Sequence, residues 1–182
     1  MSTLGEAFSL LRRHWRAAYL VALTAALVNL VPDVLRQVLV WDDPRVATAL
    51  AVDVVGFGTG LLAQLWVTGA LAGLPAGERP DRSGALGRGA QLAVRAVRRA
   101  PGTVLAGVVA GGAVSALLTV PASVAALGFD RVLGPLQSPG AGAFTVATVS
   151  DVVATAVTLP FLALVVVLVA GHSRLTTPAA GQ

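Results

Sequence analysis

The sequence predicts an all-α polytopic membrane protein with four transmembrane helices and two basic amphipathic helices at the membrane surface. Of the 182 residues, 55% are hydrophobic and 12% are charged, whereas soluble domains have roughly 25% charged residues. Four apolar runs are long enough to cross a hydrocarbon core, which takes about 20 helical residues. Two shorter stretches have arginines on one side and apolar residues on the other, which is typical of helices that lie in the membrane interface.

The first of these stretches covers about the first 16 residues. Thr3 and Glu6 have the spacing of a capping box, which predicts that a helix begins here. The apolar face of this helix would consist of Leu4, Phe8, Leu11 and Trp15. An apolar run from Ala17 to about Leu35 follows, and it exceeds the length of about 7 to 15 residues of a signal-peptide core. We therefore expect this run to be a first transmembrane span and not a signal peptide that is cleaved off.

Turn-forming residues separate the later spans. Pro32 and Asp33 mark the expected exit of the first span, and Pro44 the start of the next helix. The other three spans are predicted at residues 47–74, 103–127 and 143–170, with a polar linker at 75–84 and a tail at 172–182. Pro121 and Pro160 predict kinks in the third and fourth spans. All of this forms one membrane domain, residues 1–182.

Residues 85–100 form the second basic amphipathic stretch, which divides the chain into halves at about 1–74 and 85–171. Its arginines gather on one side of a helical wheel, and its apolar side consists of Leu86, Ala90, Ala93, Val94 and Val97. A helix of this kind is expected to contact anionic lipid headgroups. The arginines predicted to make such contacts in the two interfacial helices are Arg12, Arg13, Arg16, Arg88, Arg95, Arg98 and Arg99.

The arginines also predict the orientation. Ten of the 13 basic residues fall on the side of the two interfacial helices and three fall on the other. Cytoplasmic segments carry the excess of arginine and lysine, so both termini and the linker are expected in the cytoplasm, with the protein in the inner membrane.

Each half has the order interfacial helix, span, outer turn and a second span with one acid. The triplet Asp53-Val54-Val55 aligns with Asp151-Val152-Val153 in the last span of each half. Short matches also arise by chance in an Ala- and Val-rich chain, but the shared order favours a duplicated unit with a pseudo-twofold axis along the membrane normal.

Asp53 and Asp151 are the only acids inside the predicted spans, which makes them candidates for a proton or cation site. If they face each other across the axis, they cannot both be charged cheaply, so the pair would hold a proton or a cation. The alternative is structural: both acids lie near the outer surface and are satisfied by Thr48, Ser150, Thr155, Arg45 or the backbone.

Small and polar residues inside the spans predict helix packing. Glycines at GxxxG spacing would let helices approach closely, and they are Gly56, Gly60, Gly69, Gly73, Gly107 and Gly111. Asn29 and Gln64 are expected to bond between helices.

Several functions are disfavoured. The chain has no cysteine, and no nucleotide-binding, zinc-protease or nucleophile-elbow motif is present. His14 and His172 lie on the opposite side from the membrane acids, so no metal site or cofactor is expected. The net charge of +4 is explained by the membrane surface, so no nucleic-acid partner is expected.

The opening GEAFSLLRRHWRAAYLVALTAAL resembles a group of bacterial integral membrane proteins that includes the membrane domain attached to some glycerophosphodiester phosphodiesterases. The resemblance covers about the first 35 residues. Members of that group often have more spans, and their soluble phosphodiesterase domain has no counterpart here. The resemblance therefore implies a membrane domain and no catalytic residue.

The leading hypothesis is a non-enzymatic membrane protein that associates with itself or with an envelope or transport complex through its glycine faces. The alternative is a small oligomeric transporter or channel that uses Asp53 and Asp151. A lipid-modifying enzyme ranks third, because it would need a nucleophile, a base or a metal that the sequence does not offer.

Overall fold

The computed structural model describes residues 2–41, 46–127 and 141–171. Its helices are α1 (Thr3–Arg13), α2 (Trp15–Trp41), α3 (Val46–Ala70), the 3₁₀ turn η1 (Leu74–Ala76), α4 (Ala85–Arg99), α5 (Pro101–Leu127) and α6 (Ala141–Gly171). No strand occurs in these ranges. The predicted all-α polytopic class is therefore confirmed.

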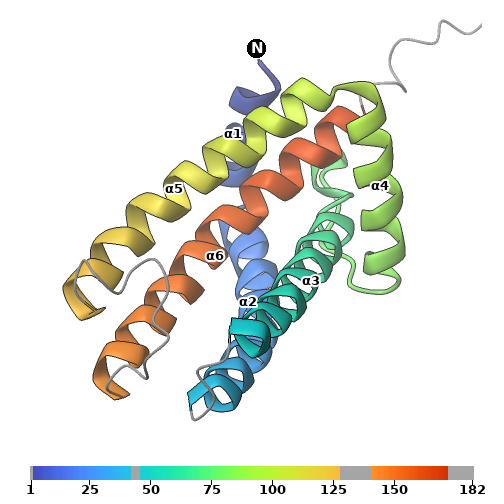
Figure 1. Cartoon of the computed structure of the whole chain (residues 1–182). Helices are drawn as coiled ribbons and strands as arrows, with labels where there is room; N and C mark the ends of the chain where they lie inside the picture. Colours follow the sequence, from blue (N-terminus) through green and yellow to red (C-terminus); the bar gives the residue numbers. More distant parts are fainter. Residues whose placement is uncertain (1, 42–45, 128–140, 172–182) are drawn as a thin grey trace, which may run out of the picture.

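The long helices α2, α3, α5 and α6 form the body of the molecule (Figure 1). Within the described residues, three segments are long and apolar enough to cross a membrane, at Val54–Ala76, Pro101–Ala122 and Thr148–Gly171. A fourth is obtained if α1 and the first part of α2 count as one broken span, because these two segments meet at an angle of 94°. The long helices keep most of their backbone hydrogen bonds internal, as hydrocarbon surroundings require.

The core gathers around the C-terminal half of α6, which packs against every other α-helix. Residues 163–170 of α6 are all buried. The α2 residues facing this core have the spacing of a single helix stripe and are Ala18, Val21, Ala22, Ala25 and Ala26. Their small side chains let α2 approach α6 closely. By contrast, α5 packs mainly on α6, and the hydroxyl of Ser150 on α6 donates to the carbonyl of Leu118 on α5 (3.2 Å).

The two short helices lie at the same end of the bundle, where α6 ends (Figure 1). Each packs on a long helix of the other half of the chain, α1 on α6 and α4 on α3. The two helix ends on either side of residues 42–45, and those on either side of residues 128–140, lie at the opposite end (Figure 1). The long helices therefore alternate in direction.

The structure corrects one prediction about α1 and shows which part of its apolar face contacts the protein. The N-cap is Ser2, whose hydroxyl accepts from the amide of Gly5 (3.3 Å), so the predicted box that begins at Thr3 starts one residue late. The buried side is formed by Ala7 and Leu11, whereas Phe8 and Trp15 are 62% and 53% exposed. The apolar pattern alone does not separate protein contact from lipid contact, because both surroundings favour the same side chains.

Some predicted boundaries also shift. The helix α2 continues through Pro32 to Trp41. A proline removes one backbone hydrogen bond, but hydrocarbon surroundings offer the backbone no other hydrogen-bond partners, so the helix is kept. The helix α3 ends at Ala70, and Gly73 lies in the turn before η1. Pro121 and Pro160 lie inside α5 and α6, which continue past them.

Candidate binding site

The surface of α4 divides into three sectors. The sector that contacts α3 and α6 is made of small or partly buried residues, namely Ala85, Gly89, Leu92, Ala93 and Ala96. The second sector is apolar and exposed: Leu86, Val94 and Val97 are 43%, 51% and 52% exposed. The third is polar and contains Arg88, Gln91, Arg95, Arg98 and Arg99. The apolar side predicted from the sequence corresponds to the second sector and includes only Ala93 of the first.

The close approach of α4 to α3 depends on Gly69 and Gly89. A Cβ at Gly69 would overlap the carbonyl of Ala85 and would lie 2.7 Å from the amide nitrogen of Gly89. A Cβ at Gly89 would overlap the carbonyl of Leu65 and would lie 3.0 Å from the amide nitrogen of Gly69. Real Cβ atoms do not tolerate such distances, so both positions require glycine.

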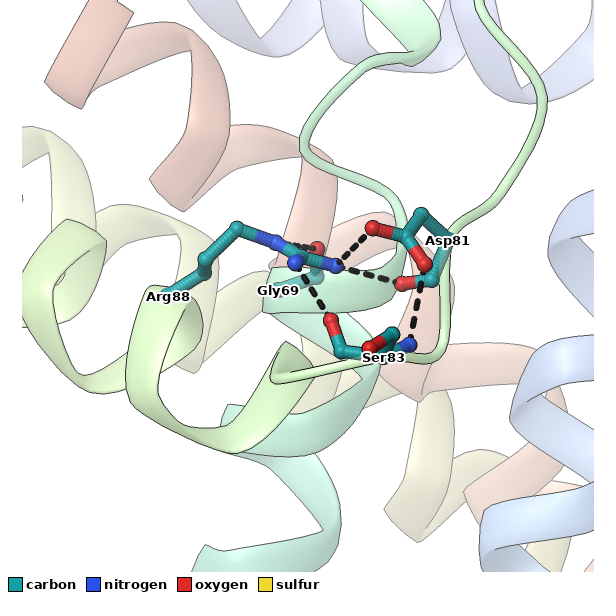
Figure 2. Close-up of polar contacts among 4 residues, drawn as sticks. All are labelled: Gly69, Asp81, Ser83 and Arg88. Carbon is teal, nitrogen blue, oxygen red and sulfur yellow. Dashed lines mark hydrogen bonds and ion pairs between the residues drawn. The ribbon is translucent and has the colours of Figure 1, made fainter.

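Arg88 holds the connection between α3 and α4 in place (Figure 2). Its guanidinium donates to the carbonyls of Gly69 (3.3 Å), Asp81 (2.6 Å) and Ser83, and it pairs with the Asp81 carboxylate at 3.0 Å. The other Asp81 oxygen accepts from the amide of Ser83 (2.9 Å). This planar fork of donors joins the end of α3, the linker and the first turn of α4.

The polar sector of α4 forms one wall of a cavity of about 710 Å³ at this end of the bundle. The other walls come from Glu6 of α1, the last turn of α3, the linker and the last turn of α6. The charged side chains in the lining are Glu6, Glu78, Arg79, Asp81, Arg88 and Arg95. A cavity of this size is within the range of small-molecule sites, roughly 300 to 1,000 Å³.

A second cavity, of about 390 Å³, lies between α2 and α3 and reaches Leu86 of α4. Its lining is mostly apolar, and it includes Asn29, Thr24, Thr59 and Trp66. The amide oxygen of Asn29 is buried without a hydrogen-bond partner among the described residues. Gln64 bonds Thr68 within its own helix (3.3 Å), so among the described residues Asn29 and Gln64 do not make the predicted bonds between helices.

The structure does not decide the predicted acid pair. Asp151 lies on α6 and is exposed, within the candidate span Thr148–Gly171. Asp53 lies on α3, but its side chain is outside the described part of the structure. A proton or cation site formed by the two remains a prediction.

The predicted lipid-contacting arginines fall into two groups. Arg12, Arg13, Arg16, Arg95 and Arg98 are exposed, and Arg16 lies over the ring of Trp15 at 5.3 Å. Arg88 and Arg99 also bind the protein itself. Arg88 donates to the carbonyl of Gly69 (3.3 Å), and Arg99 donates to the carbonyl of Ala170 (2.6 Å). Lipid contact stays a prediction for all seven, but Arg88 and Arg99 have structural roles that the sequence analysis missed.

The glycines predicted for helix packing differ in what surrounds them. Gly69 meets α4, and Gly107 packs on α6, where a Cβ would lie 3.1 Å from Val165. Gly73 meets Glu78 in the turn, so its role is to allow the turn. A Cβ at Gly60 or Gly111 would meet no atom within 4 Å, and Gly56 lies on α3.

The site also contains residues that the sequence analysis did not identify, above all Gly89, Glu78 and Arg79. A signal for Gly89 existed, because Ala85, Gly89 and Ala96 form a stripe of small residues on α4. In the part of the chain that the structure describes, no three His, Asp or Glu side chains gather as a metal site. His14 ends α1, and His172 lies outside the described residues.

Comparison of the chain with protein-family models, curated proteins and solved structures finds no match.

Proposed function

We propose that this protein is a non-enzymatic integral membrane protein that serves as a structural or accessory component of an envelope or transport complex. The observation that carries the proposal is the uncovered side of α5. Only 11% of its span is buried inside the chain, and Gly112 is exposed with space for a Cβ. Small residues on an uncovered membrane helix allow another helix to pack closely, where lipid supplies no hydrophobic drive.

The arginines support an orientation with this protein's short helices in the cytoplasm. The helices α1 and α4 lie at one end of the bundle, together with the linker that carries Arg79 and Arg82 (Figure 1). Cytoplasmic segments carry the excess of positive charge. This end of the bundle would therefore lie on the cytoplasmic side of the inner membrane, with both termini on that side.

The three sectors of α4 support a position at the membrane surface. Its exposed apolar sector would enter the headgroup boundary, and Arg95 and Arg98 would reach anionic lipids from the polar sector. The small-residue sector would meanwhile fix the helix to the rest of the protein.

The pairing of short and long helices is compatible with a duplicated unit. A twofold relation that exchanges the halves turns the contact of α1 with α6 into the contact of α4 with α3, and both contacts exist. Among the described residues, the contact of α2 with α6 has no extensive counterpart between α5 and α3. The proposed symmetry is therefore approximate.

Purification in mild detergent tests the proposal through the oligomeric state and the co-purifying proteins. We expect a complex, either with itself or with another membrane protein, and we expect Gly112→Leu to weaken it. Val109→Leu, on the same helix, is the matched control because Val109 is already large and 62% exposed. A stable monomer for wild-type protein would contradict the proposal.

Reporter fusions test the orientation. Fusions after Gly84 and Gln182 should report the cytoplasm, and fusions near Asp43 and Gln137 should report the outside. An external signal after Gly84 would overturn the orientation.

The second candidate is a small oligomeric transporter or channel that uses Asp53 and Asp151. The exposure of Asp151 within a candidate span favours it, because a carboxylate there needs water, another chain or a nearby membrane surface. A homo-oligomer with a polar lumen would support this candidate over an accessory role.

A further inference from the structure

The cavity at the end of the bundle has a charge pattern that a simple surface arginine patch lacks. Three arginines and three acids line it, in a space of about 710 Å³. A cavity for an inorganic anion would not be expected to bring this many carboxylates to its wall, and a cavity for a metal cation would not bring this many arginines. The pattern instead suits a ligand that carries both signs of charge.

One pair of charges in the lining is already used by the fold. Arg88 and Asp81 bind each other at 3.0 Å, and Arg88 also donates to three backbone carbonyls. This pair shapes the wall and leaves little capacity for a ligand.

The remaining arginines have free donors. Arg95 uses its Nε to donate to the carbonyl of Gln91 in its own helix (3.3 Å), and within the described residues its terminal nitrogens have no protein partner. Arg79 is exposed in the linker and makes no hydrogen bond or ion pair with the described residues. Two guanidinium groups on different elements thus reach one cavity, from α4 and from the linker.

The opposite charge comes from the linker. Glu78 lies in the lining beside Arg79, and the last turns of α3 and α6 form part of the wall. The carbonyls of Gly69, Ala70 and Ala170 at these helix ends already accept hydrogen bonds from Arg88, the Asp81 amide and Arg99, so Glu78 is the group that supplies the negative charge.

We infer that this cavity binds a phosphate ester that also carries an ammonium group, as in phosphoethanolamine, either free or as the headgroup of a phospholipid. Arg79 and Arg95 bind the phosphate, since guanidinium groups donate to phosphate oxygens in a bidentate manner. Glu78 receives the ammonium. The inference goes beyond the proposed function, and a titration with free ligand tests it independently of any complex or orientation.

The test is calorimetric titration of the purified full chain in mild detergent with phosphoethanolamine. We expect Arg95→Gln and Arg79→Gln each to weaken binding by about tenfold, as for loss of one charge-assisted hydrogen bond. The matched control is Arg98→Gln, since Arg98 lies on the polar sector of α4 but not in the cavity lining. We expect the control to change affinity by less than about twofold. Equal losses for Arg98→Gln and Arg95→Gln would overturn the site, because they would indicate a general charge effect.

Two further measurements identify the ligand. Inorganic phosphate and ethanolamine should each bind at least about tenfold more weakly than phosphoethanolamine, and Glu78→Gln should reduce this preference even if an arginine variant fails to fold. In native mass spectrometry, retention of phosphatidylethanolamine over phosphatidylglycerol identifies the lipid headgroup as the source, whereas binding of free phosphoethanolamine without such retention identifies the soluble ester. Absence of both, or equal binding of inorganic phosphate, overturns the inference.

Discussion

Gly69 and Gly89 face each other where α3 meets α4, and neither position has room for a methyl group. The contact is between backbones, so no side chain can move aside to make space. It sets the distance between a membrane-embedded helix and a helix at the end of the bundle, and the wall of the charged cavity depends on that distance.

Gly89→Ala should therefore destabilise the protein strongly. Overpacking in a well-packed core usually costs about 1 to 3 kcal/mol, and we expect the upper end or more, because the added Cβ would meet the Leu65 carbonyl. The measurement is reversible unfolding in detergent. Gly87→Ala is the matched control: the site is open, and alanine should stabilise the helix by up to about 1 kcal/mol. Equal behaviour of the two variants would show that the helices do not approach this closely.

Arg88→Lys should loosen the connection between α3 and α4 although the charge is kept. A single ammonium cannot reproduce the guanidinium fork that reaches Gly69, Asp81 and Ser83 together. We expect several-fold faster amide hydrogen exchange in residues 77–84. Asp81→Asn should have a smaller effect, since the carboxylate is 61% exposed and the backbone bonds remain. Arg98→Lys is the control and should leave exchange unchanged.

The fold class was predictable because hydrophobic runs of helical length have few alternative structures. The central basic helix was predicted at residues 85–100 and is found at Ala85–Arg99. Alternation of polar and apolar residues is local in the sequence, so it can be read without knowing what packs against the helix.

The wall of the cavity was not predictable in the same way. Arg88 was predicted to contact lipid, because its helical position gives its charge but not the carbonyls that the chain brings to it from Gly69 and the linker. The apolar face predicted for α1 contains both the buried Leu11 and the exposed Phe8, since an apolar side chain suits lipid and protein equally. Whether such a side chain contacts protein or lipid depends on residues that are distant in the sequence.

The three sectors of α4 predict a graded response to probes attached at single cysteines. The chain contains no cysteine, so each substitution gives one labelling site. In vesicles, a fluorescent probe at Val94 or Val97 should be quenched by lipid-attached quenchers, and a probe at Gln91 or Arg98 by a water-soluble one. Cysteine at buried Ala96 should react slowly and serves as the control. Water-soluble quenching at Val94 would remove α4 from the membrane surface.

The acid pair gives the last prediction. Asp53 and Asp151 each lie in the N-terminal half of a long helix, and the N-terminal ends of these two helices are at the same end of the bundle (Figure 1). If the two carboxylates approach each other, one proton or one cation must be held between them, because two adjacent charges in a poorly hydrated place repel strongly. Thermal stability should then depend on pH or on added cations.

Asp53→Asn and Asp151→Asn should each abolish that dependence while the protein stays folded, and the double variant should add nothing further, since one partner is enough to break a pair. Asp42→Asn, outside the predicted spans, should keep the dependence of the wild type. If the two acids are instead independent structural groups near the outer surface, the two single variants should have small effects that add in the double variant. That outcome would remove the main support for a transporter and would leave the accessory role as the better account.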